Sequence, residues 1–216
     1  MTNILLQQEI MDELEFEPSV EAKNIGVAVD NGVVTLSGHV KSYAEKVTAV
    51  TAAKRVRGVR AVADDIVVRY PSSVSVSDDE IAQRVIRIID WDIVVPTTAI
   101  QAVVRDGWVT LTGAVDWHYQ RKAAEEDVRR LVGVSGVTNK IEVKPRIIPA
   151  ETKRRIKDAL KRQGRVNTLA IDVAVENDGL VVLEGQVNDF NERHAVENAA
   201  WSAPGVRNVI DRLVIV

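Results

Sequence analysis

The chain has 216 residues, no cysteine and a formal net charge of −3. The lack of cysteine excludes disulfides, thiolate metal sites and cysteine nucleophiles, and the slightly acidic balance argues against a surface built for nucleic acid. No run is long and apolar enough to span a bilayer, and residues 1–17 lack the basic start of a secretory signal, so we expect a cytoplasmic protein, at most peripheral at a membrane.

The first 70 residues predict the order helix, strand, strand, helix, strand. Residues 4–14 place apolar side chains on one stripe of an amphipathic helix, namely Ile4, Leu5, Leu6, Ile10, Met11 and Leu14. Its other face is acidic, with Glu9, Asp12, Glu13 and Glu15. Asn31-Gly32 predicts a tight hairpin turn, since both residues tolerate a positive φ. Ser42 and Glu45 form a capping box that begins a second helix, and this helix is expected to end at Gly58, before the third strand.

This pattern occurs three times in the chain. The segment NGVVTLSGHV at residues 31–40 returns as DGWVTLTGAV at 106–115 and as DGLVVLEGQV at 178–187. A Gly-Val pair follows each segment at a constant distance, and an apolar strand ends each copy. Internal self-similarity of this kind is the signature of a repeated folding unit. We therefore predict an α+β protein of three tandem αββαβ units, repeat 1 (1–70), repeat 2 (77–144) and repeat 3 (149–216).

The recurring glycines are predicted to be structural. Glycine-rich turns can bind phosphate through backbone N–H groups, but these glycines are dispersed at the ends of predicted elements. We expect hairpin turns at Gly32, Gly107 and Gly179, close approaches between a helix and a strand at Gly38, Gly113 and Gly185, and helix C-caps at Gly58, Gly133 and Gly205.

Each repeat resembles a BON domain, a family named for bacterial osmotically inducible and nodulation-related proteins. The resemblance rests on the segment D/N-G-x-V-x-L-x-G-x-V, on the capped helix that follows it, and on the G-V-x-x-V entry into the last strand. It implies a small mixed three-stranded sheet packed by two helices on one face. It also implies a non-enzymatic module that binds phospholipid or membrane surfaces, often in the response to osmotic or envelope stress.

A strongly basic segment opens repeat 3. Between residues 144 and 165, nine Lys or Arg residues, including Arg146 and Arg165, stand against only Glu151 and Asp158. A basic amphipathic helix suits an anionic membrane surface. It would also suit nucleic-acid phosphates, a solvated face, or docking onto the acidic first helix of the same or another chain. The predicted lipid-binding residues are Arg154, Arg155, Lys157, Lys161 and Arg162.

Two tryptophans of repeat 2 receive different predictions. Trp91 follows the first helix of repeat 2 as Phe16 follows that of repeat 1, and we expect Trp91 in the core. Trp117 lies between a strand and a helix, where it could either pack or lie at a lipid headgroup interface. It therefore joins the lipid-binding candidates.

The sequence offers no constellation for catalysis or metal binding. The three histidines, His39, His118 and His194, fall at different repeat positions without partners at ligand spacing. No nucleophile elbow or Walker loop occurs. We predict a binding module that is not an enzyme and needs no metal or cofactor. Its expected partner is anionic phospholipid. The alternative is a protein–protein adaptor or a scaffold that self-assembles as a homo-oligomer, and nucleic acid is disfavoured.

Overall fold

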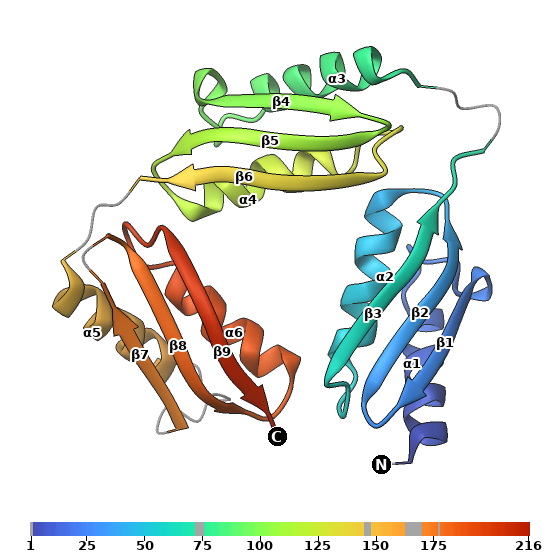
Figure 1. Ribbon diagram of the computed structural model, residues 1–216, viewed down its shortest axis with the longest axis horizontal. Coiled ribbons are helices and arrows are strands. Elements are labelled where there is room, and N and C mark those ends of the chain that lie inside the picture. The colour runs from blue at the N-terminus through green and yellow to red at the C-terminus, as the bar shows by residue number, and fades with distance from the viewer. Residues whose placement is uncertain (1, 72–75, 145–147, 163–169, 177) are drawn as a thin grey trace. The chain divides into compact units, whose positions relative to one another are not determined.

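The computed structural model describes residues 2–71, 76–144, 148–162, 170–176 and 178–216, and every structural statement below concerns these residues (Figure 1). They form three separate three-stranded sheets with the strand orders β1-β2-β3, β4-β5-β6 and β7-β8-β9. Two helices accompany each sheet, one before its first strand and one between its second and third strands. This confirms the predicted α+β class and the three αββαβ units.

Repeat 1 shows the plan of all three. Its elements are α1 (Asn3–Phe16), β1 (Ile25–Asp30), β2 (Val33–Val40), α2 (Tyr43–Arg55) and β3 (Ala61–Val68). The central strand β2 pairs antiparallel with β1 and parallel with β3, so the sheet is mixed. The hairpin between β1 and β2 has a positive φ at both turn residues, 49° at Asn31 and 81° at Gly32. This is the mirror-image turn that matches the twist of the two strands.

The other two repeats follow this order. Repeat 2 consists of α3 (Asp78–Trp91), β4 (Ile100–Arg105), β5 (Trp108–Val115), α4 (His118–Val128) and β6 (Gly136–Val143). Repeat 3 consists of α5 (Pro149–Arg162), β7 (Ile171–Val175), β8 (Leu180–Val187), α6 (Phe190–Trp201) and β9 (Asn208–Ile215). Short 3-10 helices precede β1 (Ala22–Asn24) and β4 (Thr97–Ala99).

The core of each repeat lies between one face of its sheet and its two helices. The central strands bury side chains at equivalent positions, namely Val34, Leu36 and Val40 in β2, Val109, Leu111 and Val115 in β5, and Val181, Leu183 and Val187 in β8. In repeat 1, α2 covers them with Ala49, Ala52 and Ala53. Small residues let a helix backbone come close to the sheet, and this explains the alanine-rich second helix.

The first helix buries a narrower stripe than the sequence predicts. Only Leu6, Ile10 and Leu14 are buried in α1, whereas Ile4 is 81% exposed. Leu5 and Met11 are exposed as well. Residues four apart stay on one face of a helix, and this spacing selects the buried three. The predicted single stripe of six apolar residues is therefore wrong, because half of them lie on the solvent side.

Trp91 is not in the core, contrary to the prediction. It is 84% exposed, and Phe16, its counterpart in repeat 1, is 82% exposed. Each aromatic residue ends the first helix of its repeat and follows a buried residue, Ile89 or Leu14, by two positions. Two positions correspond to about 200° around a helix, so both rings point away from the sheet.

The second glycine of the repeated segment lies under the backbone that leads into the first strand. Gly38 has a φ of 116°, and a Cβ atom built on it would lie 2.1 Å from the carbonyl oxygen of Asn24. Gly113 meets the carbonyl oxygen of Ala99 in the same way. The close neighbour is thus the end of the preceding 3-10 helix, and the expected approach to an α-helix is corrected accordingly.

The glycines predicted to be helix C-caps are not the cap residues of α2 and α6 but lie beyond them. The C-cap residues are Val56 after α2 and Ser202 after α6. Gly58 and Gly205, with φ values of 97° and 80°, lie in the turns that follow. In the turn that follows α6, the N–H of Val206 donates to the carbonyl of Ala203, so that Pro204 and Gly205 are the two central residues of a four-residue turn. This pair is typical of a type II turn.

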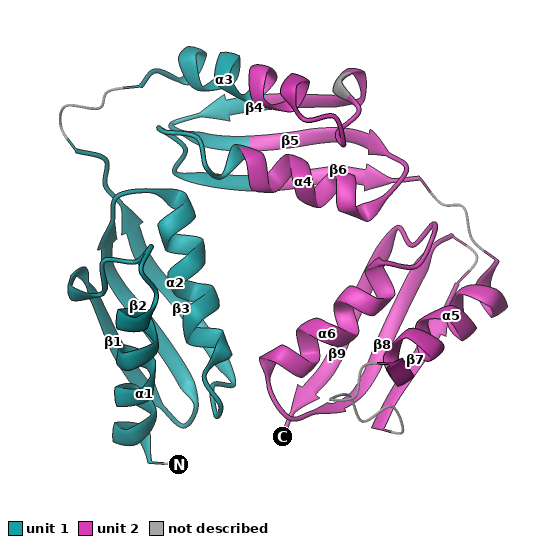
Figure 2. Cartoon of the chain, turned by 180° about the vertical axis from the view of Figure 1, so that it is seen from behind, with its two compact units in different colours: residues 1–85, 103–109, 128–137 teal, residues 86–102, 110–127, 138–216 magenta. Residues whose placement is uncertain are grey.

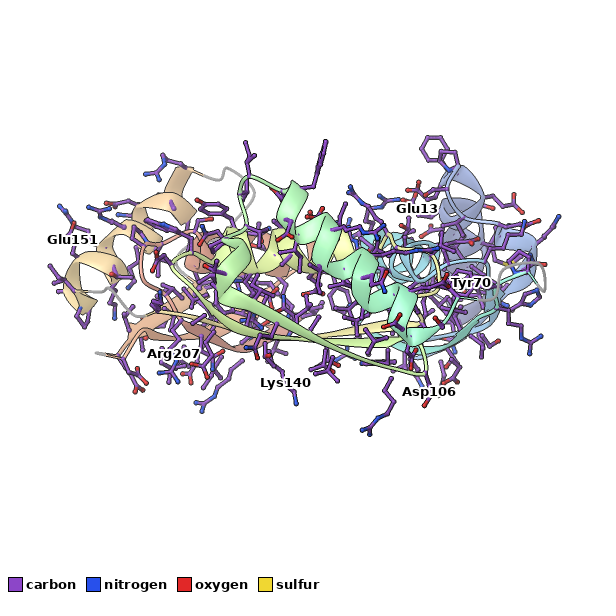
Figure 3. All side chains as sticks on the ribbon, turned by 90° about the horizontal axis from the view of Figure 1, so that it is seen from above. Glu13, Tyr70, Asp106, Lys140, Glu151 and Arg207 are labelled. Atoms are coloured by element: carbon purple, nitrogen blue, oxygen red, sulfur yellow. The ribbon has the colours of Figure 1, made fainter. Side chains whose placement is uncertain are left out.

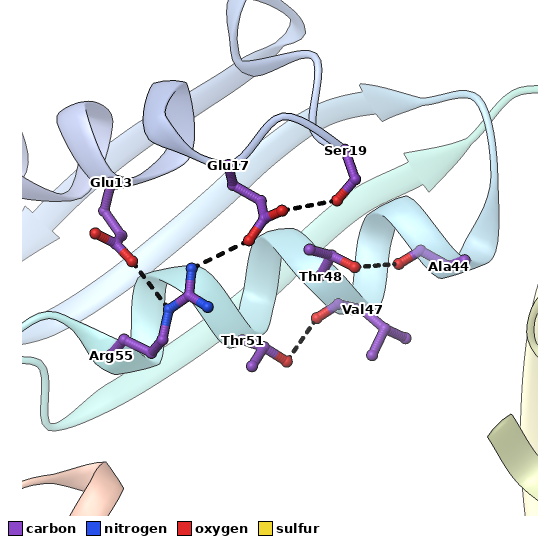
Figure 4. Close-up of polar contacts among 8 residues, drawn as sticks. All are labelled: Glu13, Glu17, Ser19, Ala44, Val47, Thr48, Thr51 and Arg55. Carbon is purple, nitrogen blue, oxygen red and sulfur yellow. Dashed lines mark hydrogen bonds and ion pairs between the residues drawn. The ribbon is translucent and has the colours of Figure 1, made fainter.

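One arginine joins the two helices of repeat 1 (Figure 4). Arg55 of α2 donates from Nε to Glu13 at 2.9 Å and from Nη2 to Glu17 at 3.2 Å. A hydrogen bond from Ser19 and the guanidinium of Arg55 lower the pKa of Glu17. Part of the negative charge along α1 is therefore matched inside the repeat.

The chain divides into two compact units (Figure 2). The first comprises residues 1–85, 103–109 and 128–137, and the second comprises residues 86–102, 110–127 and 138–216. Repeat 2 contributes to both units. Repeat 1 lies wholly in the first, and repeat 3 lies wholly in the second.

Candidate functional site

The basic helix α5 is amphipathic in the structure. Pro149 is its first residue, a position where the missing N–H group costs no helical hydrogen bond. Thr152, Ile156 and Leu160, spaced by four, are its buried residues. Six cations lie on the rest of this helix. Five of them are the predicted residues Arg154, Arg155, Lys157, Lys161 and Arg162, which we call the cationic helix surface, and the sixth is Lys153. All five predicted cations are thus presented by one helix.

Three of these cations have a carboxylate nearby within repeat 3. Arg155 bonds to Glu151 at 2.5 Å (Figure 3 labels Glu151), and Lys161 lies 3.9 Å from Asp158. Lys157 lies 3.6 Å from Asp172 of β7. A hydrogen bond from the backbone of Val173 and the nearby lysines lower the pKa of Asp172. These pairs are solvent-exposed, and such pairs are worth at most about 1 kcal/mol each, so an external anion can compete for the cations.

Arg154 and Arg162 are the most available cations of this surface. Both side chains are exposed, and within the described ranges no ion pair is recorded for either. They lie eight positions apart on the helix, or about 12 Å along its axis. Of the other basic residues named in the sequence, Lys144 lies 3.7 Å from Asp116, whereas Arg146 and Arg165 fall outside the described residues.

A hollow of about 520 Å³ runs beside the cationic helix surface, between α5 and the end of α6. Arg155, Arg162 and Asp158 line it from α5, and Ala199, Ser202 and Ala203 line it from the other side. The small side chains of Ala199, Ser202 and Ala203 leave room for a group of phosphate size next to two guanidinium groups. Arginine binds phosphate through planar, paired hydrogen bonds, and this suits the composition of the hollow.

Trp117, the aromatic candidate, belongs to repeat 2 and stands just before α4. Its side chain is 41% exposed, and its ring stacks on Tyr119 with centroids 6.3 Å apart. Gln120 donates from Nε2 to the carbonyl of Val94 at 3.2 Å, and this bond ties the start of α4 to the loop after α3. That loop carries Ile93, which is fully exposed. We call Trp91, Ile93, Trp117 and Tyr119 the aromatic tip of repeat 2.

The sequence model of the BON domain family matches the chain three times, over residues 5–70, 77–145 and 150–216. The chain belongs to the BON domain family. It is also similar to osmotically-inducible protein Y of Escherichia coli, with 34% identity over 130 residues. The match covers 58% of this chain and 65% of the relative, so the chain spans somewhat less than two thirds of the relative's length.

Two solved structures resemble the chain weakly. One is CdsD, a structural protein of the type III secretion system of Chlamydia trachomatis, with 17% identity and a TM-score of 0.29 over 97% of this chain and 91% of that chain. The other is the C-terminal domain of CdsD, with 18% identity and a TM-score of 0.28 over the full length of both chains. Scores this low say nothing about the function of the BON chain.

Sequence reasoning missed part of the exposed apolar surface of the second BON repeat. Trp91 and Ile93 alternate with Asp90 and Asp92, and acids flanking an aromatic residue at a helix end are a signal of exposure. Trp108 is a further departure, since Val33 and Leu180 occupy its position in the other repeats. Its side chain is 49% exposed and lies over Gly136 on the open face of the sheet.

The described residues contain no group of three or more His, Asp or Glu side chains placed to hold a metal ion. None of the described helices is long and apolar enough to cross a bilayer. Glu45, Gln120 and Glu192, which share one repeat position, bond to backbone groups next to their helix starts. In this part of the chain, the exposed charges and aromatic rings are therefore the features that suggest a function.

Proposed function

We propose that this chain is a non-enzymatic binding module that associates peripherally with anionic phospholipid surfaces. The cationic helix surface is the contact, with Arg154 and Arg162 as its leading residues. The observation that carries the proposal is the concentration of exposed cations on one side of a helix whose other side is buried in its own repeat. Each cation near an anionic surface adds about 1 kcal/mol of binding free energy.

The aromatic tip is proposed as a secondary contact. Tryptophan and tyrosine favour the headgroup region because their rings are apolar while their N–H and O–H groups remain hydrogen-bonded. Trp117 and Tyr119 have this character, and Trp91 and Ile93 add exposed apolar surface to the same end of repeat 2. We further propose a role in osmotic stress, which is supported by the similarity to a protein named as osmotically inducible. The cytoplasmic location stays a prediction, which cell fractionation tests.

Co-sedimentation with vesicles tests the lipid proposal. The double variant Arg154→Gln/Arg162→Gln is compared with Arg57→Gln/Arg87→Gln, which removes the same charge from exposed arginines of repeats 1 and 2. Loss of two contacts should weaken binding to phosphatidylglycerol vesicles by about 2 kcal/mol, or roughly 30-fold. The control variant should bind like the wild type. Equal weakening in both variants would remove the site assignment, because net charge alone would then set the affinity.

The alternative function, a protein–protein adaptor or self-assembling scaffold, is favoured by the solvent side of α1. There, the exposed side chains of Ile4, Phe16 and Met11 alternate with those of Asp12 and Glu15. An acidic helix with exposed apolar residues suits a cationic protein surface, and α5 of a second copy provides one. Light scattering against ionic strength tests this: an oligomer that dissociates with salt, in a protein without lipid affinity, would favour the adaptor.

A further inference from the structure

Repeats 1 and 3 share an ion pair between the second helix and the third strand. Lys46 of α2 lies 3.2 Å from Asp64 of β3, and Arg193 of α6 lies 2.5 Å from Asp211 of β9. Each aspartate also accepts a hydrogen bond from the backbone N–H two residues further on. The pair therefore neutralises the helix cation inside its own repeat.

Repeat 2 has an asparagine where the other repeats have this aspartate. Asn139 keeps the backbone hydrogen bond, from the N–H of Ile141 to its Oδ1 at 3.1 Å. Its neutral amide cannot form an ion pair with Arg121, the equivalent cation of α4. Asn139 donates from Nδ2 to the carbonyl of Arg121 at 2.8 Å and to Glu125 at 3.0 Å, and Arg121 donates to the carbonyl of Asn139 at 3.4 Å. The guanidinium carbon of Arg121 instead lies 5.7 Å from the centre of the ring of Trp201 in repeat 3.

Trp201 is contacted by a second side chain of repeat 2. The ring of His118 stacks on it with centroids 4.0 Å apart and an angle of 16° between the planes. His118 is itself a departure, since Tyr43 and Phe190 occupy its repeat position. The position of Trp201 is held by Lys54 and Arg129 in the other repeats. We call His118, Arg121 and Trp201 the inter-repeat stack, and all three belong to the second compact unit.

A crevice of about 340 Å³ adjoins the inter-repeat stack. Arg121, Lys140 and Glu142 line it from repeat 2, and Asp178, Arg207 and Ile210 line it from repeat 3 (Figure 3 labels Lys140 and Arg207). Both signs of charge occur on both sides, so neither side repels the other as a whole. Ile210 is partly buried although it faces away from the core of its own repeat.

We propose that repeats 2 and 3 of this chain associate in solution as one body, through the stacking of His118 and Arg121 of repeat 2 on Trp201 of repeat 3. Asn139 is the residue that makes this contact available, because an aspartate there would hold Arg121 within repeat 2. Aromatic pairs of this kind shift an association equilibrium by roughly 2- to 12-fold, and the arginine adds to this. The partner of this surface is thus a neighbouring repeat of the same chain.

Proton NMR of the full-length chain tests the stack directly. The three histidines give three Hε1 signals, and His118 is assigned by its loss in His118→Phe. We expect the His118 signal to be shifted upfield by the indole of Trp201 and to return to an ordinary position in Trp201→Leu. Three histidine signals at ordinary positions in the wild type would overturn the proposal.

Trp201 also packs against the core of repeat 3, so a second variant avoids that core. Asn139→Asp restores the aspartate of the other repeats and should draw Arg121 back to it. The Nε–H signal of Arg121 should then lose its ring-current shift, whereas Asp64→Asn in repeat 1 should leave this signal unchanged. An Arg121 signal that is the same in Asn139→Asp and in the wild type would show that the asparagine does not control the contact.

Discussion

Replacing Gly38 by alanine should destabilise repeat 1 far more than its small size suggests. The new Cβ would lie 2.1 Å from the carbonyl oxygen of Asn24, and the φ of 116° is a region that L-residues avoid. The strained backbone costs about 1–3 kcal/mol, and the shift needed to relieve the overlap costs about 1–3 kcal/mol more. The sum, about 2–6 kcal/mol, is comparable to the whole stability of a folding unit of about 70 residues.

Gly26→Ala is the matched control, because Gly26 lies in β1 of the same sheet. Its added Cβ would lie 3.0 Å from the side-chain oxygen of Ser37, which can rotate, and its φ is not positive. Hydrogen exchange of the full chain, resolved by peptide, measures the effect. Gly38→Ala should lose protection across residues 25–68 while repeat 3 keeps its own. Equal protection in the two variants would refute the role assigned to Gly38.

Three further predictions concern charges and caps. Asp172→Asn should strengthen binding to anionic vesicles several-fold, because Lys153 and Lys157 of α5 lose the carboxylate that they share. Vesicle titrations measure this, and unchanged binding would show that α5 does not make the contact. Burial, with the positive charges of Arg121 and Lys122, lowers the pKa of His118 to about 4. The unfolded chain therefore binds this proton more tightly, and the free energy of unfolding should fall as pH drops from about 6.5 to 4, with a smaller slope in His118→Phe. Urea unfolding at several pH values measures this, and equal slopes would contradict it. Asp189→Ala removes the 2.8 Å cap bond from the N–H of Glu192 and should cost repeat 3 about 1 kcal/mol in urea unfolding, whereas a midpoint like that of the wild type would argue against the cap.

The fold could be predicted from the sequence because its signals are local. The turn at Asn31-Gly32 depends on two adjacent residues, and the bond from the N–H of Glu45 to the side chain of Ser42 joins residues three apart. The fine placement of side chains depends on helix phase. The prediction that Trp91 lies in the core is wrong for this reason: Trp91 follows the buried Ile89 by two positions, so its ring points away from the sheet.

The cations of α5 could be named from the sequence, but their pairing could not. Asp172 approaches Lys157 only because β7 folds back beside the helix, and the spacing of the two residues in the sequence does not predict that contact. The same holds for His118 and Trp201, which are far apart in the chain. The sequence does mark them as departures from the repeat. The useful signal is therefore the residue that a repeat does not share with its neighbours.

The most direct test of the proposed function is flotation of the wild-type chain with vesicles at two salt concentrations. The chain should float with phosphatidylglycerol vesicles at about 50 mM salt and be released at about 500 mM, since screening shortens the reach of exposed charges. It should not float with phosphatidylcholine vesicles at either concentration. Absence of binding to anionic vesicles at low salt, or binding that ignores both lipid charge and salt, would contradict the assignment of the cationic helix surface as a lipid contact.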